Sequence, residues 1–149
     1  GAEYVAEDNT RKVPVMLHRA VLGSLERWIG MLIEHYAGAM PVWLSPVQVA
    51  VASITDAQID YARSVVAKMK QAGLRVTEDL RGEKINYKIR ELSLQKHPFI
   101  AVVGEKEKND GTVSIRARGG KNLGVMPLED FIAKVVDLDK NRVNTDPWQ

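Results

Sequence analysis

Two residues near the C-terminal end of the chain, Glu107 and Arg116, have side chains suited to reading a nucleobase. A carboxylate can accept hydrogen bonds from N1 and N2 of guanine, and an arginine can donate to O6 and N7. Asp110-Gly111 lies between them and favours a tight β-hairpin turn. We therefore expect the two side chains to face each other across a hairpin, where one base could contact both. The alternative, an ordinary cross-strand ion pair worth about 0.2–1 kcal/mol, is favoured by the residue types alone.

A basic segment surrounds this pair. Residues 81–121 contain ten Lys or Arg and five Asp or Glu, although the net charge of the whole chain is only +2. A local excess of cations indicates either a solvated surface or a face that binds phosphates, and the charge pattern leaves both open. On the second interpretation the further candidate contacts are Arg118 and Lys121, with a weaker group formed by Arg81, Lys84, Lys88 and Arg90.

A second chemical signal lies at the start of a helix expected near the N-terminal end. Gly23-Ser24 indicates a turn and an N-cap, apolar residues follow at three-and-four spacing, and Gly38 supplies a stop, which predicts a helix over residues 24–37. Arg27 falls in the first turn, where the helix dipole disfavours a cation. A helix start that faces an anion could use its free amides and this guanidinium together.

His18 precedes this helix and follows residues 12–17, whose alternation predicts a strand with Pro14 at an edge or irregular position. A single histidine beside a strand is ordinarily a core or surface residue. A zinc site needs three or four ligands, and the chain has no cysteine. His18 alone therefore does not define a metal site.

The rest of the chain is organised around residues 47–54, a short apolar run between turn residues, which predicts a strand buried on both faces. A capping box at residues 55–58 opens a helix that ends at Gly73, and a second strand at 74–78 completes a parallel crossover. The order of elements predicts an α/β fold with a mixed, mostly parallel sheet covered by helices, preceded by a strand and a helix. The remaining elements are expected at 85–92 (helix), 99–104 and 112–118 (strands) and 127–138 (helix).

Length and composition suggest how the chain is divided. Its 149 residues suit one domain of about 100 residues plus an appended segment. We expect the appended segment at 1–40, a proline-stiffened linker at 41–46, the domain at 47–140 and a loose tail at 141–149.

Residues 36–55 carry no charge, which raises the question of a membrane span. Pro41, Pro46 and the polar residues in this stretch favour a helix end, a loop and a buried strand instead. The N-terminal residues are polar and acidic and have no signal-peptide pattern. We therefore expect a cytoplasmic protein with no membrane partner.

The N-terminal residues are similar to a known motif. LGSLERWIG, after a predicted strand and at the start of a helix, resembles motif 3 of the class II aminoacyl-tRNA synthetases. The longer stretch EDNTRKVPVMLHRAVLGSLERWIG resembles the threonyl-tRNA synthetase family in particular. The resemblance implies that Arg27 contacts ATP, that Ser24 lines the substrate pocket and that His18 is one of three protein ligands of an active-site zinc ion.

The remaining residues resemble the anticodon-binding domain of the same family. The resemblance is carried by VQVAVASITD, DLRGEKINYKIRE and the segment GEKE…VSIRARGGKNLG. It implies that the chain binds the anticodon loop of threonine tRNA and that Glu107 and Arg116 contact the middle guanine. Gly82 departs from the family pattern, which often has asparagine there, so that only a backbone contact is available at this position.

The resemblance also sets expectations for a parent enzyme, which would be a homodimeric aminoacyl-tRNA ligase that uses threonine, ATP with Mg²⁺, and Zn²⁺. Motifs 1 and 2 and the other zinc ligands are absent from these residues. We therefore expect the 149-residue chain alone to be inactive and to bind neither zinc nor ATP. Two alternatives stay open: a prolyl, glycyl or histidyl synthetase, against which His18 argues, and a non-catalytic nucleic-acid-binding module derived from a synthetase.

Overall fold

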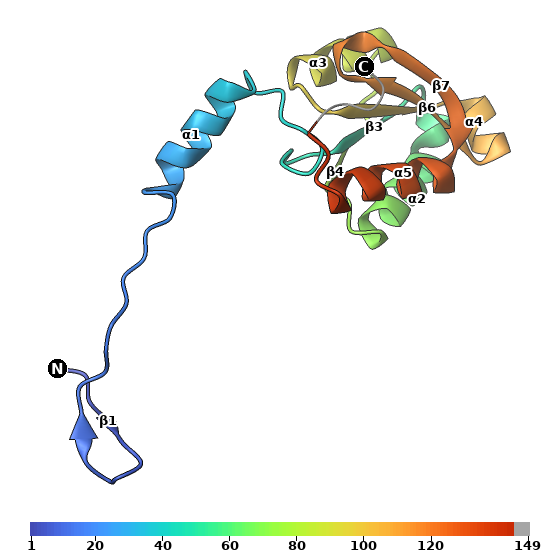
Figure 1. The fold of residues 1–149 in the computed structure, drawn as a ribbon. Coiled ribbons are helices and arrows are strands. Elements are labelled where there is room, and N and C mark those ends of the chain that lie inside the picture. Colours follow the sequence, from blue (N-terminus) through green and yellow to red (C-terminus); the bar gives the residue numbers. More distant parts are fainter. Residues whose placement is uncertain (145–149) are drawn as a thin grey trace. The chain divides into compact units, whose positions relative to one another are not determined.

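The computed structural model describes residues 1–144 of the chain, which divides into two compact units, Gly1–Met31 and Leu32–Gln149 (Figure 1). This division falls within the first helix, α1 (Leu25–His35). The domain boundaries expected from the sequence, with a linker at 41–46, stay a prediction.

The N-terminal unit contains a small antiparallel sheet of β1 (Tyr4–Val5) and β2 (Arg11–Lys12). Asp8 in the connecting turn accepts hydrogen bonds from the amide and hydroxyl of Thr10, which together with Lys12 lower the pKa of its carboxyl. The strand predicted over residues 12–17 is wrong beyond Lys12, because residues 13–17 have no regular structure and Leu17 is 91% exposed. An alternating run forms a strand only when a neighbouring strand bonds to it.

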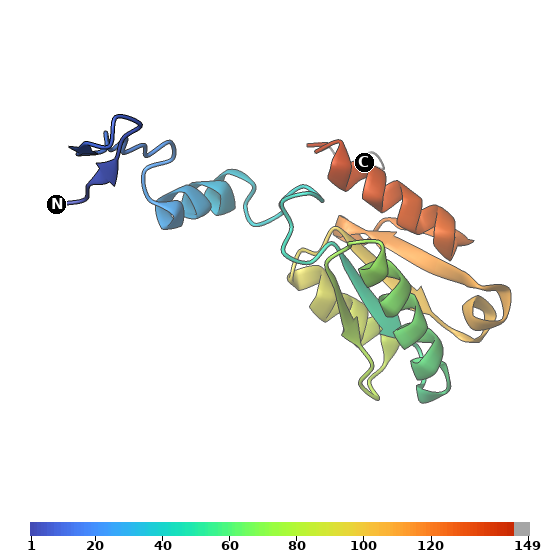
Figure 2. The ribbon, with the colours of Figure 1, turned by 90° about the horizontal axis from the view of Figure 1, so that it is seen from below.

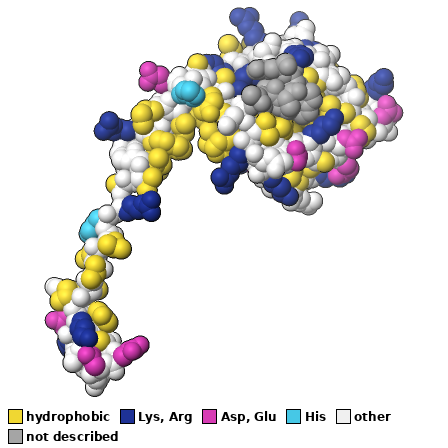
Figure 3. Space-filling view, in the orientation of Figure 1, with side chains coloured by type: hydrophobic (Ala, Val, Ile, Leu, Met, Phe, Trp, Pro, Cys, Tyr) yellow, Lys and Arg dark blue, Asp and Glu magenta, His cyan; other side chains and the backbone are white. Residues whose placement is uncertain are grey.

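The helix predicted over residues 24–37 is confirmed as α1. Ser24 is its N-cap, because its hydroxyl oxygen accepts a hydrogen bond from the amide of Arg27 at 3.2 Å. Gly38 ends it with a φ of +75°, and its amide donates to the carbonyl of Ile33. None of the residues of α1 is buried, and apolar side chains gather along it in the space-filling view (Figure 3).

The C-terminal unit is built on a five-stranded sheet with the order β4-β3-β5-β6-β7. β3 is parallel to both of its neighbours, whereas β5 and β6, and β6 and β7, are antiparallel. The predicted mixed sheet is therefore confirmed, and half of its four pairings are parallel. The strands are β3 (Val49–Ser53), β4 (Val76–Asp79), β5 (Phe99–Val103), β6 (Thr112–Ala117) and β7 (Asn122–Pro127).

Helices cover both faces of this sheet. In Figure 1, α3 (Ile85–Leu94) lies above the strands, and α2 (Ile59–Gln71) and α5 (Leu128–Lys140) lie below them. Figure 2 shows α2 and α5 on the near side of the sheet when the molecule is seen from below. The larger core cluster lies on the side of α2 and α5, and a smaller one lies under α3. The apolar stripe predicted for the last helix is confirmed, with all its members buried: Leu128, Phe131, Ile132, Val135 and Leu138.

The connection between β5 and β6 differs from the prediction. A tight hairpin turn was expected at Asp110-Gly111, but residues Glu105–Asp110 form a short helix, α4. Gly111 ends this helix in the left-handed conformation, with a φ of +67°. The same glycine signal therefore serves as a helix stop. The sequence interpretation also missed β7, because its residues are interrupted by glycine and proline and have no clear alternation.

The capping box at the start of α2 is confirmed. A short 3-10 helix, Asp56–Gln58, precedes α2, and the side-chain oxygen of Gln58 accepts from the amide of Thr55 at 3.1 Å.

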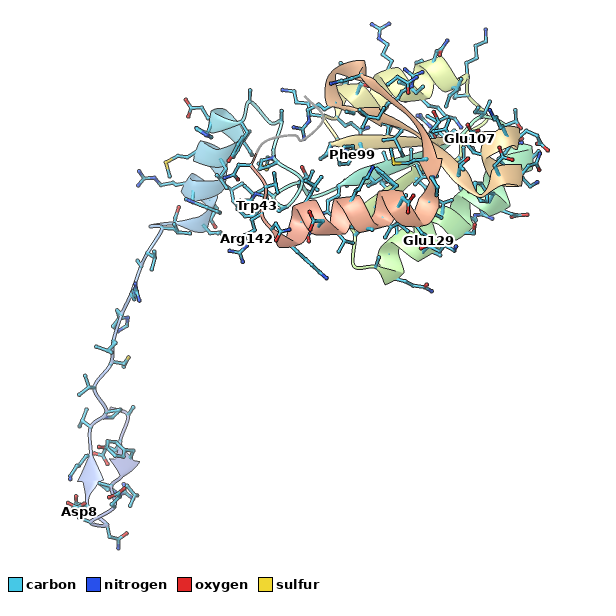
Figure 4. The ribbon with its side chains drawn as sticks, turned by 45° about the vertical axis from the view of Figure 1, so that its right-hand side comes forward. Asp8, Trp43, Phe99, Glu107, Glu129 and Arg142 are labelled. Carbon is cyan, nitrogen blue, oxygen red and sulfur yellow. The ribbon has the colours of Figure 1, made fainter. Side chains whose placement is uncertain are left out.

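The first residues of the expected tail, 141–144, include two that contact Trp43. The indole of Trp43 donates to Asn144 at 3.1 Å, and Arg142 lies over its ring (Figure 4). Residues 145–149 of the expected tail lie outside the described residues.

We predict that the pair Phe99 and Phe131 anchors the larger core. Both rings are fully buried and meet edge to face with centroids 5.7 Å apart. Phe131→Ala should lower the free energy of unfolding by about 3–5 kcal/mol, measured by urea denaturation followed by far-UV circular dichroism. Leu94→Ala is the control because Leu94 is 73% exposed, and it should change this free energy by less than about 0.5 kcal/mol. Equal effects of both substitutions would contradict the assigned core.

Candidate nucleic-acid interface

Glu107 lies in the first turn of α4, at the end of the sheet where β5 stops (Figure 4). Its carboxylate accepts a hydrogen bond from the amide of Gly104 at 2.9 Å and so caps the helix. A Cβ at Gly104 would lie 2.9 Å from this carboxylate oxygen and 2.7 Å from the side chain of Ile54. Only glycine therefore fits there without displacing the carboxylate.

Arg116 lies near the other end of β6, where its strand partner on β5 is Ile100. The expectation that Glu107 and Arg116 face each other across a hairpin is thus wrong, because Glu107 is on a helix. Arg116 lies four residue steps beyond Thr112 along the strand, which is about 13 Å at the usual rise per residue. A base that contacts both side chains must lie along β6. The reading of a guanine by these two residues stays a prediction.

β6 carries a polar strip, which is a row of half-buried polar residues on one face of the sheet. Thr112, Ser114 and Arg116 are half-buried and alternate with buried apolar residues that belong to the larger core. Arg116 and Ser114 pair with Ile100 and Val102, which pack in the smaller cluster under α3. Because paired residues point to the same face, this polar strip lies on the α3 side of the sheet.

Lys88 is buried, so the expectation that its side chain faces solvent and contacts RNA is wrong. Its side chain is 1% exposed, and its ammonium group donates to the backbone oxygens of Ser53 at 2.9 Å and Asp79 at 3.3 Å. It therefore joins the ends of β3 and β4 and cannot touch a nucleic acid directly. Its spacing gave the signal: Lys88 follows Ile85 by three residues and precedes Leu92 by four, which places it on the buried face of α3.

Arg81 is exposed but paired with two carboxylates. Its Nε donates to Asp79 at 2.9 Å, and its Nη2 donates to Asp79 at 2.7 Å and to Glu91 at 2.5 Å. These hydrogen bonds are the largest cause that lowers the pKa of both carboxyl groups. Two anions around one cation leave no excess positive charge here. Of the weaker basic group, Lys84 and Arg90 are exposed and form no ion pair within residues 1–144.

A polar cavity of about 360 Å³ lies beside Arg81. Its lining carries more carboxylates than cations, so it is suited to groups that donate hydrogen bonds and not to phosphates. The exocyclic amino groups of bases are donors of this kind. The lining residues are Thr77, Glu78, Asp79, Leu80, Arg81, Glu91, Leu92 and Gln95.

Arg118 and Lys121 follow β6 in a turn that leads to β7. Arg118 opens a short 3-10 segment, Arg118–Gly120, and its guanidinium group donates to three main-chain carbonyls. We expect Arg118 to contact a phosphate or a base, and in the structure it also holds the main chain through these three bonds. Lys121 is exposed, and its own backbone oxygen accepts from Ala117 at 2.9 Å.

In the N-terminal unit, His18, Ser24 and Arg27 are all exposed. The structural part of the Ser24 interpretation is confirmed by its capping bond, whereas the roles of the three residues toward zinc, substrate and ATP stay predictions. Among residues 1–144, no group of three or more His, Cys, Asp or Glu side chains is arranged to hold a metal ion. Over the same residues, no helix is both long and apolar enough to cross a membrane.

The C-terminal unit is an α/β module whose mixed sheet carries a polar strip on β6. The family model described as "Anticodon binding domain" matches residues 48–138, so the chain belongs to that family.

The similar proteins agree with this family. The chain is 62% identical to a threonine–tRNA ligase of Herminiimonas arsenicoxydans and 63% identical to that of Aromatoleum aromaticum, over 91% and 90% of its length. It spans 21% of the length of each of these relatives. It also resembles the RNA-binding domain of threonyl-tRNA synthetase from Cryptosporidium parvum, with a TM-score of 0.76 and 34% identity over 91% of this chain and 34% of that one.

We predict that the ion pair of Asp79 with Arg81 makes stability depend on pH. Asp79 is buried and its pKa lies below the ordinary 3.8. A depressed carboxyl pKa contributes stability that is present above about pH 4 and is lost as the pH falls through the folded-state pKa. The destabilisation by Asp79→Asn, measured by urea denaturation, should therefore be larger at pH 7 than at pH 2.5.

Arg81→Ala supplies the control for this prediction. Without the guanidinium, Asp79→Asn should have a much smaller effect at pH 7 than it has in the wild-type background. An effect of Asp79→Asn that is the same at both pH values, or the same in both backgrounds, would show that the pair does not control stability.

Proposed function

We propose that this chain is the anticodon-binding part of a threonine–tRNA ligase and that it binds the anticodon stem-loop of threonine tRNA. The family match over residues 48–138 carries this proposal, and the identity of about 60% to curated threonine–tRNA ligases supports the particular amino acid.

The polar strip of β6 and the first turn of α4 are the surfaces best suited to the anticodon. Single-stranded loops are recognised through splayed bases whose edges are exposed to side chains. Arg116 can donate to O6 and N7 of the middle guanine while the Glu107 carboxylate accepts from N1 and N2. The carboxylate can do so while it caps α4, because each oxygen has two acceptor sites. Lys121, Lys84 and Arg90 are exposed cations that can contact phosphates.

The parent enzyme in this proposal activates threonine with ATP and Mg²⁺ and transfers it to its tRNA as a cytoplasmic homodimer. In it, Arg27 would lie against ATP, Ser24 would line the substrate pocket and His18 would supply one zinc ligand. The donor set of this chain does not by itself fit zinc, because His18 has no second and third ligand near it among the described residues. For the 149-residue chain alone, the proposed role is therefore RNA binding.

The proposal predicts how affinity depends on the middle base. Arg116→Ala and Glu107→Gln should each weaken binding of the threonine anticodon stem-loop by about 1–3 kcal/mol, because each removes contacts to one guanine edge. The same substitutions should cost much less with a stem-loop whose middle base is adenine. Fluorescence titrations of both stem-loops at two salt concentrations measure this.

Lys84→Ala is the matched control, since Lys84 is an exposed cation on the same unit. It should weaken both stem-loops about equally and flatten the salt dependence, as expected for a phosphate contact. If Arg116→Ala also lowers affinity equally for both middle bases, Arg116 contacts a phosphate and its base-reading role is wrong.

We also predict that the 149-residue chain forms no threonyl-adenylate. Its residues supply one candidate ATP contact and one candidate zinc ligand, which is fewer than an active site needs. Threonine-dependent exchange of labelled pyrophosphate into ATP should stay at the level of a blank reaction, with or without added zinc. Exchange above the blank that is lost in Arg27→Ala would contradict this expectation.

A further inference from the structure

The main chain that follows α1 is bonded to side chains of the C-terminal unit. Between residues 37 and 45, the backbone oxygens of six residues accept hydrogen bonds from side chains that lie outside this segment. These donors come from Lys96, from Arg118, and from Gln48 and Arg75 at the edge of the sheet. The acceptors are Ala37, Ala39, Met40, Val42, Trp43 and Ser45. Residues 37–45 are therefore hydrogen-bonded to the rest of the C-terminal unit.

Arg118 is the donor that reaches this segment from the candidate RNA surface. Its Nη1 donates to Ala39 at 2.8 Å, its Nη2 to Met40 at 2.6 Å, and its Nε to the carbonyl of Lys96 at 3.0 Å. A guanidinium group holds its donors in one plane with fixed angles, so three carbonyls bound at once fix the side chain firmly.

The candidate RNA contacts flank Arg118 in the sequence. Arg116 precedes it by two residues and Lys121 follows it by three. Between Arg118 and Lys121 lie Gly119 and Gly120, with φ values of +82° and +84°. Two consecutive glycines have more conformational freedom than other residues, so the turn is easily loosened unless both of its sides are restrained.

We propose that Arg118 is a positioning residue that couples RNA binding on β6 and the following turn to the main chain at the end of α1. This inference rests on the proposed function. RNA held by Arg116 and Lys121 restrains the turn on both sides, so the three bonds of Arg118 open less often, and residues 38–40 open less often with them. Coupling is reciprocal. Loss of the three Arg118 bonds therefore lowers the RNA affinity by the same factor by which bound RNA favours these bonds.

The coupling gives Arg118 a use beyond holding a loop. The helix that ends at this segment, α1, carries Ser24 and Arg27 at its start. Occupancy of the anticodon site would thus change the mobility of the main chain at the C-terminal end of α1.

Hydrogen–deuterium exchange of the 149-residue chain, with and without saturating threonine anticodon stem-loop, tests this inference. The amides of Gly38 and Ala39, which donate to Ile33 and Tyr36, should exchange about threefold or more slowly with RNA. Arg118→Met should abolish this slowing. Arg118→Lys should keep part of it, since an ammonium group can still donate to the carbonyls.

Arg75→Met is the matched control. Arg75 is also an arginine bonded to this segment, through the carbonyls of Val42, Trp43 and Ser45, but it precedes β4 and not the RNA-binding turn. Its loss should speed exchange at residues 42–45 and leave the RNA-dependent slowing at Gly38 and Ala39 intact. An equal loss of that slowing in Arg75→Met would overturn the specific role of Arg118.

The remaining outcomes separate the inference from the proposed function. If the wild-type chain does not bind the stem-loop, both fail. If it binds with the expected dependence on Arg116 but Gly38 and Ala39 exchange at an unchanged rate, the coupling alone is wrong. If Arg118→Met weakens binding while the slowing persists, Arg118 is a direct RNA contact and the coupling is again wrong.

Discussion

The structure depends on one constraint: β3 is completely buried on both faces. All five of its residues have no exposed surface, so a layer of helices is needed on each side of the sheet. α2 and α5 supply one layer, and the ten residues of α3 supply the other over β3 and β5. On this side of the sheet α3 does not cover β6, so the polar residues of β6 stay half-exposed. The polar strip proposed to bind RNA is therefore a consequence of how α3 covers β3 and β5.

The buried Lys88 belongs to the same arrangement. An ammonium group away from water is costly unless it is hydrogen-bonded, and the ends of β3 and β4 offer it two carbonyls. By fixing Asp79, it also fixes the carboxylate that holds Arg81. The buried Lys88 thus helps to hold the exposed surface at residues 79–91 in place. This surface is less basic than its sequence indicates, because Arg81 pairs with two carboxylates.

The features predicted correctly from sequence are those encoded by neighbouring residues. Ser24 as an N-cap, the capping box of Thr55 and Gln58, and the apolar stripe of α5 each depend on spacings of three or four residues. Asp110-Gly111 misled the prediction because a left-handed glycine ends a helix as readily as it forms a hairpin. The partners of Arg118 could not be predicted, since the carbonyls it binds at Ala39 and Met40 lie 79 and 78 residues away.

The central claim is that RNA lies on the polar strip of β6, on the turn that follows it and on α4, and leaves the sheet face covered by α2 and α5 free. It is tested most directly by two-dimensional ¹H–¹⁵N nuclear magnetic resonance spectra of the labelled chain, titrated with the threonine anticodon stem-loop. The account predicts that the largest shift changes fall on amides of β6, of the turn at Arg118–Gly120 and of α4, with small changes on the exposed sides of α2 and α5. Largest changes on α2 and α5, with β6 unaffected, would contradict it.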